Sequence, residues 1–191
     1  MNIHEAIYGR RSVRAYDSKA VSERVLKKLV DAAIQAPSAM NEQAWIFTII
    51  RDPDVLHQIS TCAKAHILAK ATDEVSGQIR AMLADPLFNI FYHAPALVII
   101  SGPENSAWMK ENCALAAENF MLAAYAEGLG TCWIGFAQHW LATPVGRAAA
   151  RIPDKHLAVA PIVVGHPKAE ASKVPRRSAK IDWIDASAYA P

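Results

Sequence analysis

The residues best suited to chemistry are three arginines and a serine within five consecutive positions near the start of the chain. In an extended segment, Arg10, Ser12 and Arg14 lie on one side and Arg11 and Val13 on the other, because successive side chains alternate. Guanidinium groups bind phosphate oxygens in bidentate geometry. One side of this segment is therefore a candidate anion site, and the alternative is a solvated basic turn.

Two further segments could bind a flat heterocycle. The polar loop PSAMNEQ begins at Pro37, which ends a helix, and its amide and hydroxyl groups could hydrogen-bond the edge of a ring. The stretch GLGTCWIGF over residues 128–136 offers a glycine-flanked backbone that could approach a ring closely. It is not a dinucleotide fingerprint, because Trp133 occupies the third glycine position and a helix precedes it. Taken singly, an ordinary helix-stop loop and an ordinary core strand remain the alternatives.

The basic pair Arg176 and Arg177 near the other end of the chain completes the candidate set. Taken alone, such a pair is typical of solvated surface. Cys62 and His66 are four residues apart on a predicted helix, but two ligands do not make a zinc site, so no metal is expected. The sequence contains no P-loop, no HExxH motif and no GxSxG elbow.

Composition and charge describe a globular protein and argue against a general polyanion binder. The chain has 191 residues, 52% of them hydrophobic, and a formal net charge of +2. This length fits one domain over residues 1–191, and the near-neutral charge does not fit nucleic-acid binding. The sequence shows neither a transmembrane segment nor the apolar run of a signal peptide, and three widely spaced cysteines suit reduced thiols. We expect a cytoplasmic protein that binds neither nucleic acid nor membrane.

Helices and strands are predicted to alternate along the chain. Periodicity, caps and breakers predict helices over residues 2–9, 22–36, 54–70, 72–84 and 105–127 and from Thr143 onward, and strands over 45–50, 96–101, 131–136 and 157–165. Apolar residues on more than one face predict that the 105–127 helix is buried nearly all round. A long central helix with four or five strands favours an α/β fold of the α+β type, with a mixed sheet flanked by helices.

Taken together and in this order, the candidate segments resemble the nitroreductase family of flavoproteins. RRSVR follows an N-terminal helix, PSAMNEQAW ends the next helix, GLGTCWIGF follows the long helix, and PRR comes late. The resemblance covers essentially the whole chain, and RRSVR with the PSxxNxQ pattern is its most diagnostic part. One departure is Ala44, which stands where the family usually has proline.

The resemblance implies that flavin mononucleotide (FMN) binds between the subunits of an intertwined homodimer. Arg10, Arg11 and Ser12 would hold the ribityl phosphate and chain, and Arg14 would lie near the N1/O2 edge of the flavin. On the tail, from about residue 167 to 191, Arg176 and Arg177 would complete the phosphate site. The remaining contacts would be Pro37, Ser38, Ala39, Met40 and Asn41 from the other subunit, and the backbone N–H groups of Ile134 and Gly135 toward flavin N5.

The resemblance also implies an oxidoreductase whose chemistry is centred on the flavin, without a catalytic side chain. Hydride from NADH or NADPH would pass via flavin N5 to a flat electron acceptor, such as a nitroaromatic, a quinone or a flavin, in a ping-pong mechanism. The alternatives are a flavin-binding module without turnover, a specialised dehalogenase or flavin-fragmenting enzyme, and a structural α/β dimer without a cofactor.

Overall fold

The computed structural model describes residues 1–70, 77–172 and 174–184, and its centre is a four-stranded sheet with the strand order β1-β2-β4-β3. The strands are β1 (Ile46–Ile50), β2 (Ala96–Pro103), β3 (Gly130–Trp133) and β4 (His156–Gly165). All three pairs of neighbouring strands are antiparallel. A parallel pairing occurs at an isolated bridge between Ser12 and Thr131, on the free edge of β3.

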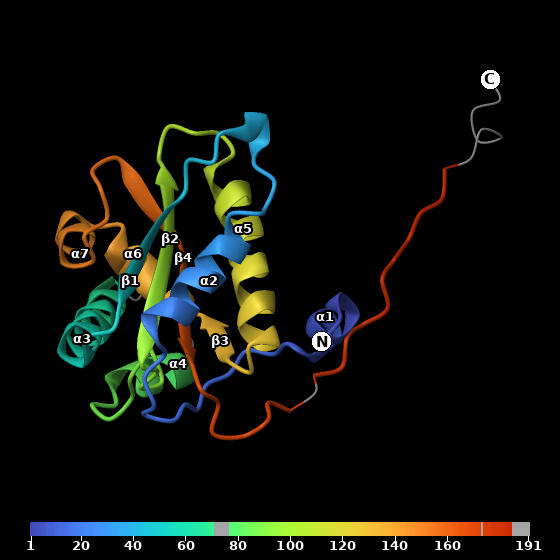
Figure 1. The fold of residues 1–191 in the computed structure, drawn as a ribbon. Helices are drawn as coiled ribbons and strands as arrows, with labels where there is room; N and C mark the ends of the chain where they lie inside the picture. Colours follow the sequence, from blue (N-terminus) through green and yellow to red (C-terminus); the bar gives the residue numbers. More distant parts are fainter. Residues whose placement is uncertain (71–76, 173, 185–191) are drawn as a thin grey trace.

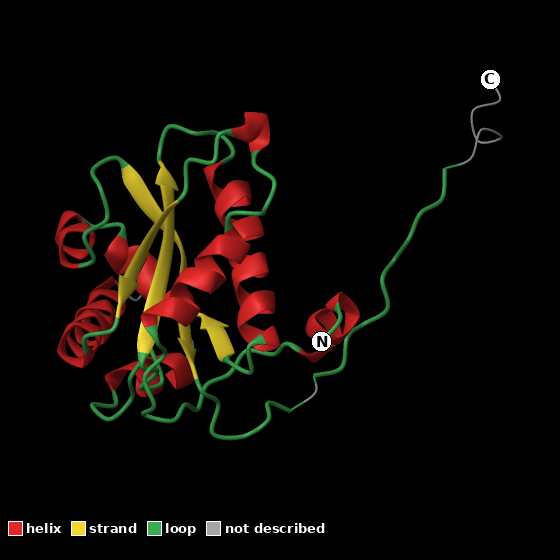
Figure 2. Ribbon diagram, in the orientation of Figure 1, coloured by secondary structure: helices red, strands yellow, loops and turns green. Residues whose placement is uncertain are grey.

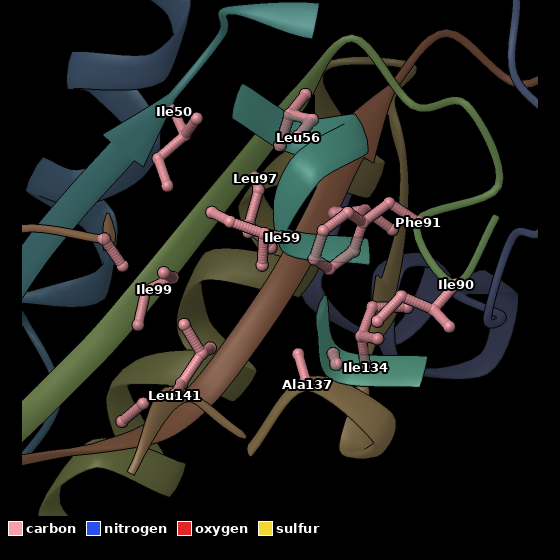
Figure 3. Close-up of a cluster of buried hydrophobic side chains, with 14 of the residues drawn as sticks. Ile50, Leu56, Ile59, Ile90, Phe91, Leu97, Ile99, Ile134, Ala137 and Leu141 are labelled. Carbon is pink, nitrogen blue, oxygen red and sulfur yellow. The ribbon is translucent and has the colours of Figure 1, made fainter. Parts of the chain in front are cut away.

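Helices cover both faces of this sheet (Figure 1, Figure 2). On one face lie α2 (Glu23–Ala33) and α5 (Met109–Ala126); on the other lie α3 (Pro53–Lys70) with α4 (Gly77–Ala84), and α6 (Gly135–Leu141) with α7 (Pro144–Ala149). Each face has its own buried core. Figure 3 shows the core on the α3 side, where Leu56 and Ile59 lie close to Leu97 and Ile99 of β2. The predicted α/β class of the α+β type is confirmed.

Several helices begin where the capping residues predict. The hydroxyl of Ser22 accepts the N–H of Val25 at 3.3 Å at the start of α2, which is the arrangement expected of a serine N-cap. Helix α2 ends at Ala33, short of the predicted Ala36. Of the helix predicted over 72–84, the structure describes α4 from Gly77 onward, and residues 72–76 lie outside the described part.

The strand predicted over residues 131–136 is wrong in its second half. β3 stops at Trp133, and α6 begins at Gly135. Ala137, Trp140 and Leu141 of α6 are buried, which is the spacing of one helical face. The six apolar residues were too short a run to separate a strand from the first turn of a helix.

The prediction that the central helix is buried all round is also wrong. Helix α5 buries Cys113, Phe120 and other residues against the sheet and α2. Leu115, however, is 45% exposed, and Glu111 and Glu118 on the same side are exposed as well. One stripe of α5 therefore faces outward in the single chain.

The N-terminal helix and the described part of the C-terminal tail lie at one side of the molecule (Figure 1). Helix α1 (Ile3–Gly9) packs against α5, where Gly9 leaves room for the ring of Tyr125. After β4 the chain pairs with Tyr16 through a bridge at Pro167 and then extends away from the body (Figure 1). Among the described residues, no helix is both long and apolar enough to cross a membrane.

Candidate functional site: an arginine-lined cleft

The segment from Arg10 to Arg14 runs along the free edge of β3. The N–H of Val13 donates to the carbonyl of Thr131 at 2.9 Å. This close approach requires glycine at position 130, because a Cβ there would lie 2.7 Å from Cγ2 of Val13. The contact with β3 fixes the backbone from which the arginine side chains project.

Tyr16 holds the same segment from the core side. Its hydroxyl donates to the carbonyl of Val13 at 2.7 Å, and its side chain is buried, which raises the pKa of Tyr16 far above the ordinary value. Burial also raises the pKa of Cys132, although the nearby charge of Arg14 opposes that shift. Both groups are therefore protonated at neutral pH and add no negative charge beside the arginines.

The arginine segment and the C-terminal tail enclose one cleft. This cavity of about 350 Å³ is lined by Arg10, Arg11, Ser12 and Arg14 and by Ala171, Ser172, Val174 and Arg176 of the tail. The structure thus brings together basic residues from opposite ends of the sequence. Arg177 does not line the cleft.

Arg11 lines the cleft although strict alternation would place it on the opposite side. Its Nη1 donates to the carbonyl oxygens of Tyr8 at 2.9 Å and Arg10 at 2.7 Å. The segment here leaves helix α1, with Arg10 as the helix C-cap, so it is not regularly extended and the alternation rule fails. Four side chains of the segment, rather than three, therefore face the cleft.

Two arginines of this cleft have N–H groups without a hydrogen-bond acceptor among the described residues. Nε of Arg10 and Nε of Arg11 are buried, and neither has a hydrogen-bond partner within the described ranges. Arg10 forms an ion pair with the half-exposed carboxylate of Glu118, which lies 3.6 Å from Nε. Buried polar groups are nearly always hydrogen-bonded. We therefore expect a bound ligand to supply the acceptor for these N–H groups. The described residues that line the cleft include no acidic side chain, so a phosphate group fits it.

The candidate residues Pro37, Ser38, Ala39, Met40 and Asn41 lie elsewhere. They contain the 3₁₀ turn η1 (Ala39–Asn41), which contacts the start of α5, whereas Gly9 contacts Tyr125 near its end (Figure 1). At 1.5 Å per residue, Asn112 lies about 20 Å along α5 from Tyr125 and about 9 Å from Glu118, which Arg10 reaches. None of residues 37–41 lines the arginine cleft of its own chain.

The same loop has an unusual backbone. Met40, Asn41 and Gln43 all have positive φ, at 52°, 54° and 47°. Such conformations cost residues other than glycine roughly 1–3 kcal/mol each and concentrate at functional sites. Met40 is also 92% exposed, so this strained loop presents its apex outward.

The backbone donors expected at Ile134 and Gly135 differ from each other. The N–H of Ile134 donates to the carbonyl of Pro161 at 2.8 Å, and its side chain belongs to the core (Figure 3). This corrects the expectation that Ile134 offers its N–H to a ligand. Gly135 is the first residue of α6, and the first N–H groups of a helix have no intrahelical acceptor, so Gly135 is the better donor.

Two residues that support these segments were not singled out from the sequence. Tyr16 supports the arginine segment, and Asn112, a buried residue of α5, accepts the N–H of Ala39 at 2.9 Å. Neither belongs to a motif, and the partners of Asn112 are distant in the sequence, so no spacing could reveal its role. Glu118, which also belongs to no motif, pairs with Arg10.

Comparison with known proteins identifies the family of this fold and site. The profile described as "Nitroreductase family" matches residues 7–166. The chain belongs to the nitroreductase family. One curated member of similar sequence is protein DrgA of Synechocystis, which is 32% identical over 197 residues, covering 93% of this chain and 90% of that protein. The FMN reductase (NADPH) of Bacillus subtilis is 26% identical over 184 residues, covering 92% of this chain and 70% of that protein.

Solved structures of nitroreductases share the whole architecture. The crystal structure of the nitroreductase with bound FMN from Bacteroides fragilis superposes with a TM-score of 0.83 and is 30% identical, covering 97% of this chain and all of that one. A nitroreductase with bound FMN from Desulfitobacterium hafniense has a TM-score of 0.81 at 23% identity, covering 97% of this chain and all of that one. The second likeness concerns the fold alone.

Proposed function

We propose that this chain is an FMN-dependent oxidoreductase that takes hydride from NADH or NADPH and reduces a flat acceptor such as a nitroaromatic, a quinone or a flavin. The observation that carries the proposal is the cleft in which Arg10, Arg11 and Arg176 converge, where the buried Nε atoms of Arg10 and Arg11 find no hydrogen-bond partner among the described residues. In a member of the nitroreductase family, the phosphate that this cleft fits is the phosphate of FMN. The names of relatives such as FMN reductase (NADPH) support the same assignment.

The residues of the chain would bind and orient the cofactor. Arg10, Arg11, Ser12 and Arg176 would hold the phosphate, the N–H of Gly135 would face N5, and Arg14 would place a positive charge near the N1/O2 edge. Bound FMN supplies the hydride chemistry. No acidic or basic side chain of the chain is needed as a proton donor, and both substrates would use the same slot in turn, which is a ping-pong scheme.

The working unit in this proposal is a homodimer. Residues 37–41 do not line the arginine cleft of their own chain, so the loop would contact the flavin of the partner subunit. The outward stripe of α5 with Leu115, together with exposed Ile7 on α1 and Ile181 and Trp183 on the tail, offers apolar surface for such a dimer. We also propose a cytoplasmic location, which suits the three free thiols.

The absorbance spectrum of the purified protein tests the cofactor. We expect flavin bands, or their appearance when FMN is added to the apoprotein. Anaerobic titration with NADH and with NADPH should then bleach these bands, and a panel of nitroaromatic and quinone acceptors should restore them. A colourless protein that takes up no FMN would overturn the proposal. A protein that binds FMN but is reduced by neither nicotinamide would be a flavin-binding module without turnover.

A further inference from the structure

Asn112 uses both ends of its side chain to hold the loop of residues 37–43. Its Oδ1 accepts the N–H of Ala39 at 2.9 Å, and its Nδ2 donates to Oε2 of Glu42 at 3.2 Å. The same Oε2 accepts the hydroxyl of Ser106 at 2.8 Å. Asn112 is only 5% exposed, so these partners satisfy an amide that water does not reach.

The helix that carries Asn112 is firmly seated on the sheet. Near the start of α5, Met109 and Cys113 pack against Gly102 at the end of β2, where a Cβ would lie 2.7 Å from Cγ of Met109. The N–H of Asn112 itself donates to the carbonyl of Trp108 at 2.9 Å. The side chain of Asn112 therefore projects from a rigid element, which makes it suitable as a fixed reference point for a loop.

The loop needs such an anchor because its backbone is strained. Its internal bonds, from the N–H of Gln43 to Oγ of Ser38 at 3.1 Å and from Nε2 of Gln43 to Oδ1 of Asn41 at 2.7 Å, link loop residues to one another. The bonds to Asn112 and Ser106 link the loop to the body of the protein. Left-handed residues such as Met40 persist only where surrounding contacts over-determine them.

We propose that Asn112 and Glu42 are positioning residues. They set the conformation of the loop of residues 37–43, so that its residues 37–41 are placed for the flavin site of the partner subunit. This inference rests on the proposed FMN-dependent dimer. Neither side chain lines the arginine cleft, and each acts through the loop. The pair sets FMN affinity by pre-organising the loop, since a loop that must be ordered on binding lowers affinity.

The proposal is tested by variants that exchange the hydrogen-bond donor of Asn112 and the acceptor of Glu42. Asn112→Asp keeps the acceptor for Ala39 but sets a carboxylate against that of Glu42, so we expect the Kd for FMN to rise about tenfold, equivalent to about 1.4 kcal/mol. Glu42→Gln alone keeps an acceptor oxygen and should bind FMN almost as the wild type does. In the double variant, the amide of Gln can donate to the new Asp, and the Kd should return to within about threefold of the wild-type value.

Asn119→Asp is the matched control. Asn119 lies on the same helix, and its Nδ2 donates to the carbonyl of Ala32 on α2 at 3.4 Å. We expect a lower melting temperature for this variant with an unchanged Kd for FMN, measured by flavin fluorescence. The positioning role is overturned if Asn112→Asp binds FMN like the wild type, if the double variant gives no recovery, or if Asn119→Asp weakens binding equally. Failure of the wild type to bind FMN would instead overturn the proposed function, and this inference with it.

Discussion

Replacing Arg14 should affect the reduction of the flavin without affecting the stability of the fold. Arg14 is exposed, so its replacement by alanine should change the free energy of unfolding by no more than about 0.5 kcal/mol. A positive charge near the N1/O2 edge would stabilise the negative charge that the flavin gains on reduction. We therefore expect Arg14→Ala to slow anaerobic flavin reduction about tenfold or more, at full FMN occupancy, in stopped-flow measurements.

Arg24→Ala is a suitable control for this prediction, because Arg24 is an exposed arginine on α2 away from the cleft. The rate of flavin reduction in the Arg24→Ala variant should match that of the wild type. An unchanged rate for Arg14→Ala in protein that carries its full complement of FMN would contradict the role given to Arg14.

Cys113 makes the stability of the fold depend on pH in the alkaline range. Burial raises the pKa of the Cys113 thiol from 9.0 to about 11. The unfolded chain then loses this proton at lower pH than the folded protein does, so the contribution of the thiol to stability is complete below pH 9 and falls between about pH 9 and 11. Denaturant unfolding should show a shallower decline over this window for Cys113→Ala than for the wild type. Parallel curves, offset by a constant cavity cost, would rule this out.

Sequence reasoning identified the residues with strong chemical character and missed their supports. Arg10, Arg14 and Arg176 could be predicted because guanidinium clusters have a defined chemistry, and the structure lines one cleft with them. Tyr16 and Asn112 could not, since a buried hydroxyl or amide acquires its role only from partners that folding brings near.

At the scale of elements, the edge contact between the arginine segment and β3 depends on Gly130, and the nearby Gly128 offers a comparison. Gly130 lies where a side chain would collide with Val13, whereas Gly128 has open space around it but a φ of +73°. Gly130→Ala should push the arginine segment off β3, and we expect it to lower both the melting temperature and the affinity for FMN. Gly128→Ala should cost about 1–2 kcal/mol of stability, with FMN affinity unchanged.

Isothermal titration with FMN, at a temperature where both variants are folded, distinguishes the two glycines. Equal losses of affinity in both variants would mean that general destabilisation, and not displacement of the arginine segment, controls the site. Wild-type affinity in Gly130→Ala would mean that the register of this edge does not matter to binding.

Element boundaries were the least predictable feature of the fold. The strand β4 and the cap of α2 at Ser22 follow from local signals, and both form as expected. The change from β3 to α6 at Gly135 does not follow from them, because the burial of Trp140 and Leu141 against α3 and the sheet decides it. Tertiary packing overrides a short apolar pattern in this region.

At the scale of the whole molecule, the two parts of the proposed flavin site lie apart in a single chain. The arginine cleft lies beside α1 and the tail, and the strained loop lies by Asn112. Such a division suits a dimer with two-fold symmetry, in which each chain gives its arginines to one site and its loop to the other. In such a dimer the partner chain would cover the exposed stripe of α5 that carries Leu115.

This division predicts complementation between two defective chains. A variant that lacks the cleft (Arg10→Ala with Arg176→Ala) and a variant that lacks loop anchoring (Asn112→Asp) should each bind FMN poorly as homodimers. In a mixed dimer, one site receives intact arginines from one chain and an intact loop from the other. Random mixing at equal amounts then makes about a quarter of all sites native, which differently tagged, co-expressed chains should show as recovered tight FMN binding. If both parts of the site came from the same chain, the mixed dimers would bind no better than the two variants alone.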